Sequence, residues 1–146
     1  MLEIYEGALP TLDIYQKWEN LASEKNFGAL SVFTGIVREE NEIVGLSFDI
    51  YEPLLKKWFH QWQHLALEQH FALIFMAHSR GDVLQGKSSF MCAISASQRK
   101  NVLSLYERFI ENFKTNAPIW KYDLINGERI YALERSKPLI GSGLLR

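Results

Sequence analysis

Four basic side chains are the groups in this sequence best suited to act together chemically: Arg38, Arg99, Lys114 and Lys121. The two lysines lie on either side of Pro118, which cannot continue a helix and redirects the chain. Two ammonium groups held close together lower each other's pKa, so a neutral lysine becomes available as a base or nucleophile. Clustered cations also attract anionic substrates such as phosphate esters. The alternative is that all four are solvated charges at the ends of helices and strands.

Two histidines, His60 and His64, are four residues apart, which places them on one face of a helix, as in the zinc motif His-Glu-x-x-His. Gln61 occupies the position of the glutamate in that motif, and no third ligand is evident. The sequence therefore favours a solvated helix face, and we expect no metal site.

A stretch at residues 81–88 satisfies the pattern Gly-x-x-x-x-Gly-Lys-Ser of nucleotide-binding loops. Such a loop must lead from a strand into a helix, whereas Phe90, Cys92 and Ile94 alternate behind it as in a strand. We therefore expect a turn-rich connection, with nucleotide binding as a rival hypothesis. Cys92, on the apolar face of that strand, is expected to be a core residue rather than a reactive thiol.

The length and composition are typical of one globular domain, which we expect to cover residues 1–146. The net charge of −1 excludes a protein that coats nucleic acid through bulk positive charge. A single cysteine excludes an internal disulfide. The N-terminus lacks a signal-peptide pattern, and no apolar run approaches the roughly 20 residues that span a bilayer, so we expect a cytoplasmic protein without membrane association.

The elements that position the four cations begin with a helix, for which Thr11 is a candidate N-cap. A buried strand is expected over residues 28–37 and a half-buried strand over residues 44–51. Glu52-Pro53 then opens a long amphipathic helix, since proline is tolerated in a first turn. This arrangement places Arg38 directly after a strand.

Strands are expected over residues 71–77 and 88–95, with a turn-rich connection at residues 81–87 between them. A second long helix should run from Arg99 to about Lys114, with its apolar side facing inward. Arg99 would then begin a helix, and Lys114 would end it where the helix dipole favours a cation.

Beyond Pro118, short strands are expected at residues 119–122 and 130–133. The resulting order is α, β, β, α, β, β, α, β, β. Adjacent strand pairs predict an α+β fold with a mixed, largely antiparallel sheet and flanking helices. The tail at residues 136–146 contains Pro138 and two glycines, and we expect it either to be mobile or to become ordered on a partner.

Several segments, in this order, resemble the large-subunit family of molybdopterin synthase, the MoaE family, over about residues 28–131. The most specific segment is Lys114-Thr115-Asn116-Ala117-Pro118-Ile119-Trp120-Lys121. The other segments are Phe33-Thr34-Gly35-Ile36-Val37-Arg38, Tyr51-Glu52-Pro53, His78 with Gly81 and Gly86, and Ser97-Gln98-Arg99.

The resemblance implies an α/β hammerhead fold and a homodimer of large subunits within a heterotetramer. Each large subunit would bind a small ubiquitin-like sulfur-carrier subunit, whose Gly-Gly C-terminus, carried as a thiocarboxylate, enters the pocket of the large subunit. The implied reaction transfers sulfur to cyclic pyranopterin monophosphate to make molybdopterin, with this chain as the catalytic subunit. No cofactor is implied, and the partner supplies the sulfur. A non-enzymatic module that binds a phosphate ligand or a protein tail is the alternative.

By the same resemblance, Lys114 and Lys121 match the active-site lysines of the family. Lys114 would transfer protons and stabilise charge near the thiocarboxylate carbon, and Lys121 would support it and hold the pterin. Arg38 and Arg99 match anion-binding arginines that would grip the cyclic phosphate. The other predicted substrate-binding residues are Ile36, Val37, Gln98, Tyr122 and Asp123.

The chain departs from the family pattern in three places. A His-Arg pair of the family reads Gln98-Arg99, and because glutamine cannot shuttle protons near neutral pH, a catalytic histidine there is excluded. A second His-Arg pair reads His78-Ser79-Arg80, so its arginine is displaced by one residue. A late pocket arginine is either Arg135, next to Glu134, or absent, which bears on how the pocket is completed across a dimer.

Overall fold

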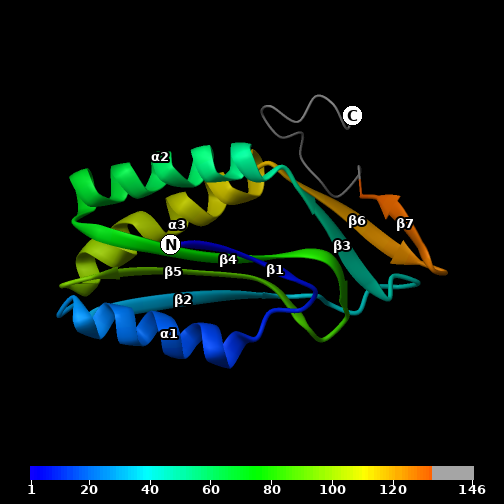
Figure 1. Cartoon of the computed structure of the whole chain (residues 1–146), viewed down its shortest axis with the longest axis horizontal. Coiled ribbons are helices and arrows are strands. Elements are labelled where there is room, and N and C mark those ends of the chain that lie inside the picture. Colours follow the sequence, from blue (N-terminus) through cyan, green and yellow to red (C-terminus); the bar gives the residue numbers. More distant parts are fainter. Residues whose placement is uncertain (133–146) are drawn as a thin grey trace.

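A computed structural model describes residues 1–132, in which one mixed sheet is packed against helices on both faces (Figure 1). Residues 133–146, which include Arg135 and the tail predicted at residues 136–146, lie outside the described part. In chain order the elements are β1 (Leu2–Glu6), α1 (Thr11–Glu24), β2 (Ala29–Ile36), β3 (Gly45–Ile50), α2 (Glu52–His70), β4 (Ala72–Leu84), β5 (Ser88–Ala96), α3 (Arg99–Asn116), β6 (Ile119–Ile125) and β7 (Glu128–Tyr131).

The sheet has the order β2-β5-β4-β3-β6-β7, and β1 pairs in parallel with β4 beside this path. All other pairs are antiparallel. The long strand β4 connects two halves, because its first part pairs with β5 and its last part, from Gly81 to Leu84, pairs with β3. Gly81 has a positive φ of 80°, which lets the strand bend here without a steric penalty. Figure 1 shows β3, β6 and β7 extending beyond the helices from this bend.

Two helices cover one face of the sheet, and the third covers the other (Figure 1). The larger core lies under α2 and α3, and a smaller core lies between α1 and the opposite face. The apolar stripes predicted from the sequence are confirmed by the buried helical residues Ile14, Trp18, Ala22, Leu55, Trp58, Ala66, Val102, Leu105 and Phe109. Phe59 is also buried, although the predicted stripe of its helix did not include it. No helix within residues 1–132 is both long and apolar enough to cross a membrane.

The structure corrects the expected element boundaries. Thr11 is the first helical residue rather than the N-cap; Pro10 occupies that position, and its carbonyl accepts the first helical hydrogen bond from Ile14. The strand expected at residues 71–77 continues to Leu84, so the connection expected at residues 81–87 shrinks to a tight turn before β5. Strand β1 was not expected at all. The described part of the fold is nevertheless α+β with a largely antiparallel sheet, as predicted.

A tight hairpin joins β6 to β7 through Asn126 and Gly127, which both have positive φ values, 51° and 77°. An Asn-Gly pair is favoured in such turns because both residues tolerate this conformation. The hairpin makes β6 longer than the short strand predicted at residues 119–122, and β7 lies two residues earlier than predicted.

Gly45 allows β3 to pair closely with β4, and replacing it should loosen the sheet there. A Cβ atom at Gly45 would lie 2.6 Å from the carbonyl oxygen of Val83 and 3.1 Å from the Cα of Leu84. Because both are backbone atoms that cannot move aside, we expect Gly45→Ala to lower the free energy of unfolding by about 2 to 3 kcal/mol, measured by urea denaturation. The control is Val44→Ala at the exposed neighbouring position, which should change it by no more than about 0.5 kcal/mol. Equal stability of the two variants would contradict the predicted clash.

Candidate active site

Lys121 is the third residue of β6 and lies directly opposite Phe48 of β3. Residues opposite each other in an antiparallel pair project from the same face of the sheet. Lys121 therefore shares a face with Phe48, which is buried against Val37 and Val83. Its side chain is half-buried.

Lys114 projects from the last turn of α3, which continues two residues beyond the predicted end at Lys114. The preceding residue, Phe113, stacks on Phe90 with ring centroids 4.1 Å apart and lies 5.8 Å from the ring of His78. His78 in turn meets Phe48 edge-on at 4.9 Å. These four rings, which we call the His78 cluster, lie between the element that carries Lys114 and the strand pair that carries Lys121. The cluster thus connects Phe113, the residue before Lys114, with Phe48, the strand partner of Lys121.

Two tryptophans hold the end of α3 against α2. The indole N–H groups of Trp58 and Trp62 both donate to the Oδ1 atom of Asn112, each at 2.9 Å. Asn112 precedes Lys114 by two residues, so these bonds fix the helical turn from which Lys114 projects. Lys114 itself remains exposed, and its position is set by the buried side chains around it.

The segment after β2 reaches the same end of the molecule. Val37 is buried with Phe48, while Ile36 is 60% exposed and Arg38 is exposed. The Val37 N–H donates to the carbonyl of Lys87 and the Val37 carbonyl accepts from the N–H of Gly86, so the turn before β5 anchors this segment. Arg38 therefore follows a residue that packs against Phe48, the strand partner of Lys121.

Arg99 is separated from the other three cations within one chain. It begins α3, whereas Lys114 lies near the opposite end of the same helix. A rise of 1.5 Å per residue puts them roughly 22 Å apart along the helix axis. Gln98 is the N-cap residue of α3 and makes no side-chain capping hydrogen bond. The structure therefore does not bring Arg99 to Lys114 within one chain.

Tyr122 and Asp123 were both predicted to bind substrate, but adjacent residues of a strand point to opposite faces. Asp123 lies opposite Leu46 and shares the face of Lys121, where it is 9% exposed. Tyr122 faces the other way, under the guanidinium of Arg129 at 4.1 Å from its ring centroid. Burial, followed by the nearby Asp49, raises the pKa of Tyr122. The structure therefore brings Asp123, and not Tyr122, to the side of the lysines.

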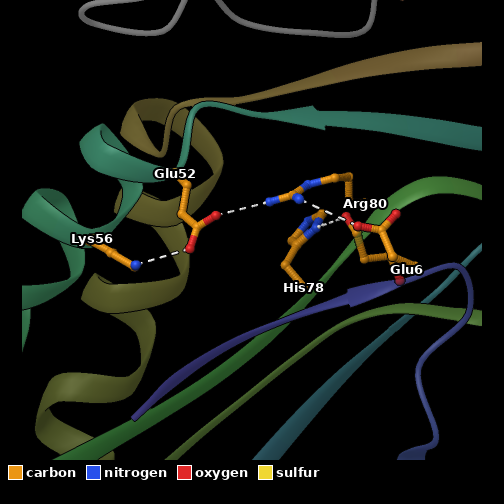
Figure 2. Close-up of polar contacts among 6 residues, drawn as sticks. Glu6, Glu52, Lys56, His78 and Arg80 are labelled. Atoms are coloured by element: carbon orange, nitrogen blue, oxygen red, sulfur yellow. Dashed lines mark hydrogen bonds and ion pairs between the residues drawn. The ribbon is translucent and has the colours of Figure 1, made fainter.

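Arg80, the arginine displaced from the family pattern, is held in ion pairs, as Figure 2 shows. Its guanidinium lies 3.2 Å from a carboxylate oxygen of Glu52 at the start of α2 and 3.4 Å from one of Glu6 at the end of β1. Lys56, followed by Arg80, holds the pKa of Glu52 below its usual range. Arg80 thus ties three elements together, and two carboxylates balance its charge.

The thiol, the glycine-rich turn and the histidine pair singled out in the sequence lie in surroundings that do not suit a reactive thiol, a nucleotide or a metal ion. Cys92 is fully buried in the core, as predicted, and burial raises its pKa to about 12. Gly81 lies within β4, and the turn after it enters a strand, so the context of a nucleotide-binding loop is missing. His60 and His64 are exposed, and His64 lies 3.2 Å from Glu68. Within residues 1–132, no group of three or more His, Cys, Asp or Glu side chains is arranged to hold a metal ion.

Sequence reasoning did not assign a role to His78. The residue is 3% exposed, and its Nδ1 atom lies 2.8 Å from the carbonyl oxygen of Ser79. Burial lowers its pKa to about 4, an effect that the hydrogen bond to Ser79 only partly offsets. The rings that meet it from β3, β5 and α3 are all phenyl, and the nearby Arg80 is paired with Glu52 and Glu6 (Figure 2). His78 is therefore neutral at physiological pH.

This lowered pKa predicts an acid-sensitive stability. Above pH 6.5 both folded and unfolded chains carry a neutral His78; between pH 6.5 and about 4 only the unfolded chain takes up the proton, so stability falls as pH falls. The total loss should be about 3 kcal/mol and should level off below the folded pKa. Urea denaturation of the wild type and of His78→Phe at several pH values measures it. The variant should lose less stability on acidification, because it lacks the proton uptake of His78, whereas the other three histidines contribute equally to both proteins. If the free energies of unfolding of the two proteins fell in parallel with pH, the lowered pKa of His78 would be contradicted.

Comparison with known proteins places these features in a family. The profile of the MoaE family, described as "MoaE protein", matches residues 10–116, which include Arg38, Arg99 and Lys114 and end before Lys121. A curated relative, the molybdopterin synthase catalytic subunit of Helicobacter pylori strain 26695, is 60% identical over 99% of each chain. A relative of the same name from Dictyostelium discoideum is 31% identical and covers 71% of this chain and 70% of its own length.

Two solved structures are similar over most of the chain. One is a complex of subunits 1 and 2 of molybdopterin-converting factor from Helicobacter pylori, with a TM-score of 0.92, 59% identity and coverage of 99% of both chains. The other, molybdopterin synthase from Staphylococcus aureus, shares the fold with a TM-score of 0.75, 24% identity and coverage of 88% of this chain and 94% of that one. The family profile and the full-length relatives confirm the resemblance seen in the sequence: the chain belongs to the MoaE family.

Proposed function

We propose that this chain is the catalytic subunit of a molybdopterin synthase, which converts cyclic pyranopterin monophosphate to molybdopterin. The sulfur comes from the thiocarboxylated Gly-Gly C-terminus of a small ubiquitin-like subunit. The main support is the full-length relative of 60% identity that bears this enzyme's name. A similar solved structure is itself a complex of two subunits, which supports a partner for this chain.

The contacts that link the neighbours of Arg38, Lys114 and Lys121, through Val37, Phe113 and Phe48, support this chemistry. The reactants are anionic, since one carries a phosphate and the other a thiocarboxylate, and clustered cations bring them together against their mutual repulsion. Lys114, exposed at the end of α3, is placed to transfer protons and stabilise charge at the thiocarboxylate carbon. Lys121, half-buried on β6, supports it and holds the pterin, with Ile36, Val37 and Asp123 at the edge of the same pocket.

A homodimer completes the site in this proposal. Arg99 and Gln98 lie at the far end of α3 from Lys114, so a second copy must bring them to the lysines. There Arg99 grips the cyclic phosphate together with Arg38, because a guanidinium matches a phosphate through two parallel hydrogen bonds. With one small subunit on each large subunit, the assembly is a heterotetramer. Tyr122, whose side chain lies on the opposite face of β6, is no longer part of the proposed pocket on the face of Lys121.

No thiol of this chain takes part, because the small subunit delivers the sulfur. The single cysteine of the chain, Cys92, is buried in the core, and its raised pKa keeps the thiol protonated at neutral pH. The reaction then requires no cofactor in this subunit. The chain acts as one domain, and we place it in the cytoplasm, where its thiol remains reduced.

Reconstitution tests the proposal. The purified chain is combined with a thiocarboxylated small subunit and cyclic pyranopterin monophosphate, and molybdopterin formation is followed; the control contains the same small subunit with an ordinary carboxylate. Product should form only with the thiocarboxylate. Tight binding of partner and precursor without product would instead favour the non-enzymatic binding module.

A further inference from the structure

His78 occupies the centre of the contacts that relate the two lysine-bearing parts of the molecule. It lies on β4, two residues after the fully buried Met76 and on the same face of the strand. Its ring is 4.9 Å from Phe48 at an interplanar angle of 82°, and 5.8 Å from both Phe90 and Phe113. It is thus the ring in this cluster that contacts both Phe48 and Phe113.

Two of these contacts, those with Phe113 and Phe48, involve residues next to the two lysines in the helix and in the sheet. Phe113 immediately precedes Lys114 in α3, so a shift of the Phe113 ring moves the last turn of the helix. Phe48 pairs with Lys121 in the register of β3 and β6, so a shift of Phe48 moves the strand beneath the second lysine. The thickness and angle of the His78 ring therefore influence the separation of the two lysines.

The ring is also held in one orientation and one charge state. Nδ1, at 2.8 Å from the carbonyl oxygen of Ser79, donates its proton there, which prevents the ring from flipping. A protonated ring at this position would place a positive charge among three phenyl rings, whereas the neutral ring adds none. An aliphatic side chain would fill the space without presenting a flat edge to Phe48.

We propose that His78 is a positioning residue that sets the separation of Lys114 and Lys121 through its contacts with Phe113 and Phe48. The inference rests on the proposed function of the lysines and adds a residue that acts through them without touching substrate. A misplacement of reacting groups by about 1 Å can cost about a hundredfold in rate, so the geometry of a buried ring can control turnover.

The test compares His78→Leu with His78→Phe in the reconstituted enzyme, with its small subunit and the pterin precursor. Leucine removes the flat ring, and we expect kcat to fall about ten- to a hundredfold with KM within about twofold. Phenylalanine keeps a flat ring of similar size and should restore kcat to within about threefold of wild type, although its unfolding midpoint should be lower because the Ser79 carbonyl loses its donor. The inference also remains testable through His78→Phe if the leucine variant fails to fold.

Two control variants separate positioning from general loss of stability. Met76→Ala removes a buried side chain from the same face of the same strand, and it should lower the unfolding midpoint while leaving kcat unchanged. His70→Leu makes the same substitution at the end of α2, where the ring contacts Ser104, and should also leave kcat unchanged. If Met76→Ala lowers kcat as much as His78→Leu does, the effect is one of stability and the inference fails.

The two possible failures are distinguishable. Lys114→Ala and Lys121→Ala, assayed alongside, report on the proposed function: full activity in both would remove the catalytic role of the lysines. If these variants are impaired while His78→Leu retains wild-type kcat, the proposed function stands and the positioning role of His78 is overturned. If His78→Phe is as slow as His78→Leu, the flat ring is not what matters, and the inference is likewise overturned.

Discussion

Replacing Lys114 with alanine is expected to lower kcat of the reconstituted enzyme by about a thousandfold, because the reaction loses the group that transfers protons and stabilises charge at the thiocarboxylate carbon. The side chain is exposed, so the fold should survive with an unchanged unfolding midpoint. Molybdopterin formation under single-turnover conditions measures the chemical step apart from product release. Binding of the small subunit, measured separately, should change little.

The matched control is Arg108→Ala. Arg108 is an exposed cation on the same helix, and its removal changes the net charge of α3 by the same amount. It should leave kcat within about twofold, since loss of a distant surface charge is largely screened by salt. Full turnover by Lys114→Ala, or an equal loss in both variants, would contradict a specific catalytic role for Lys114.

A mixture of two inactive variants should regain activity if the site is shared between copies of the chain. Lys114→Ala removes the lysine, and Arg99→Glu reverses the charge at the other end of α3. A glutamate in the first turn favours the helix dipole, so the second variant should fold at least as well as wild type. Repulsion of the substrate phosphate should lower its activity about a hundredfold or more.

After subunit exchange, half of the dimers contain one chain of each kind, and each of these has one site with both Lys114 and Arg99 intact. The mixture should therefore recover about a quarter of wild-type activity. A mixture of Arg108→Glu with Lys114→Ala provides the reference for the activity of the mixture, since Arg108→Glu homodimers keep Lys114 and Arg99 in both of their sites. No recovery, in a mixture whose exchange is verified by mass spectrometry, would mean that Arg99 does not complete the lysine site of a second copy.

Much of the architecture follows from local patterns in the sequence. The helical stripes place Trp18, Trp58 and Phe109 inward because burying one apolar face of a helix decides its orientation. Cys92 could be assigned to the core because it alternates with apolar neighbours in a strand. The Asn126-Gly127 turn also has a sequence signal, an Asn-Gly pair between strand-forming residues, which would have given the full length of β6.

Other features depend on contacts between distant segments. Strand β1 has only five residues, and it exists because β4, about seventy residues later, offers an edge for parallel pairing. The continuation of β4 past Gly81 depends likewise on pairing with β3. Short strands have little intrinsic preference, so their partners decide whether they form.

The features of the candidate site can likewise be separated into those given by the sequence and those given by tertiary packing. The residue types and family order of Lys114, Lys121, Arg38 and Arg99 are properties of the sequence, and so is the absence of a histidine at Gln98. The tertiary structure decided that the His78 cluster links the end of α3 to the strand partner of Lys121 and that Arg99 lies at the far end of α3. It also decided that Asp123, rather than Tyr122, shares the face of Lys121. Sequence periodicity defines the faces of single elements, but only packing between elements determines which faces meet.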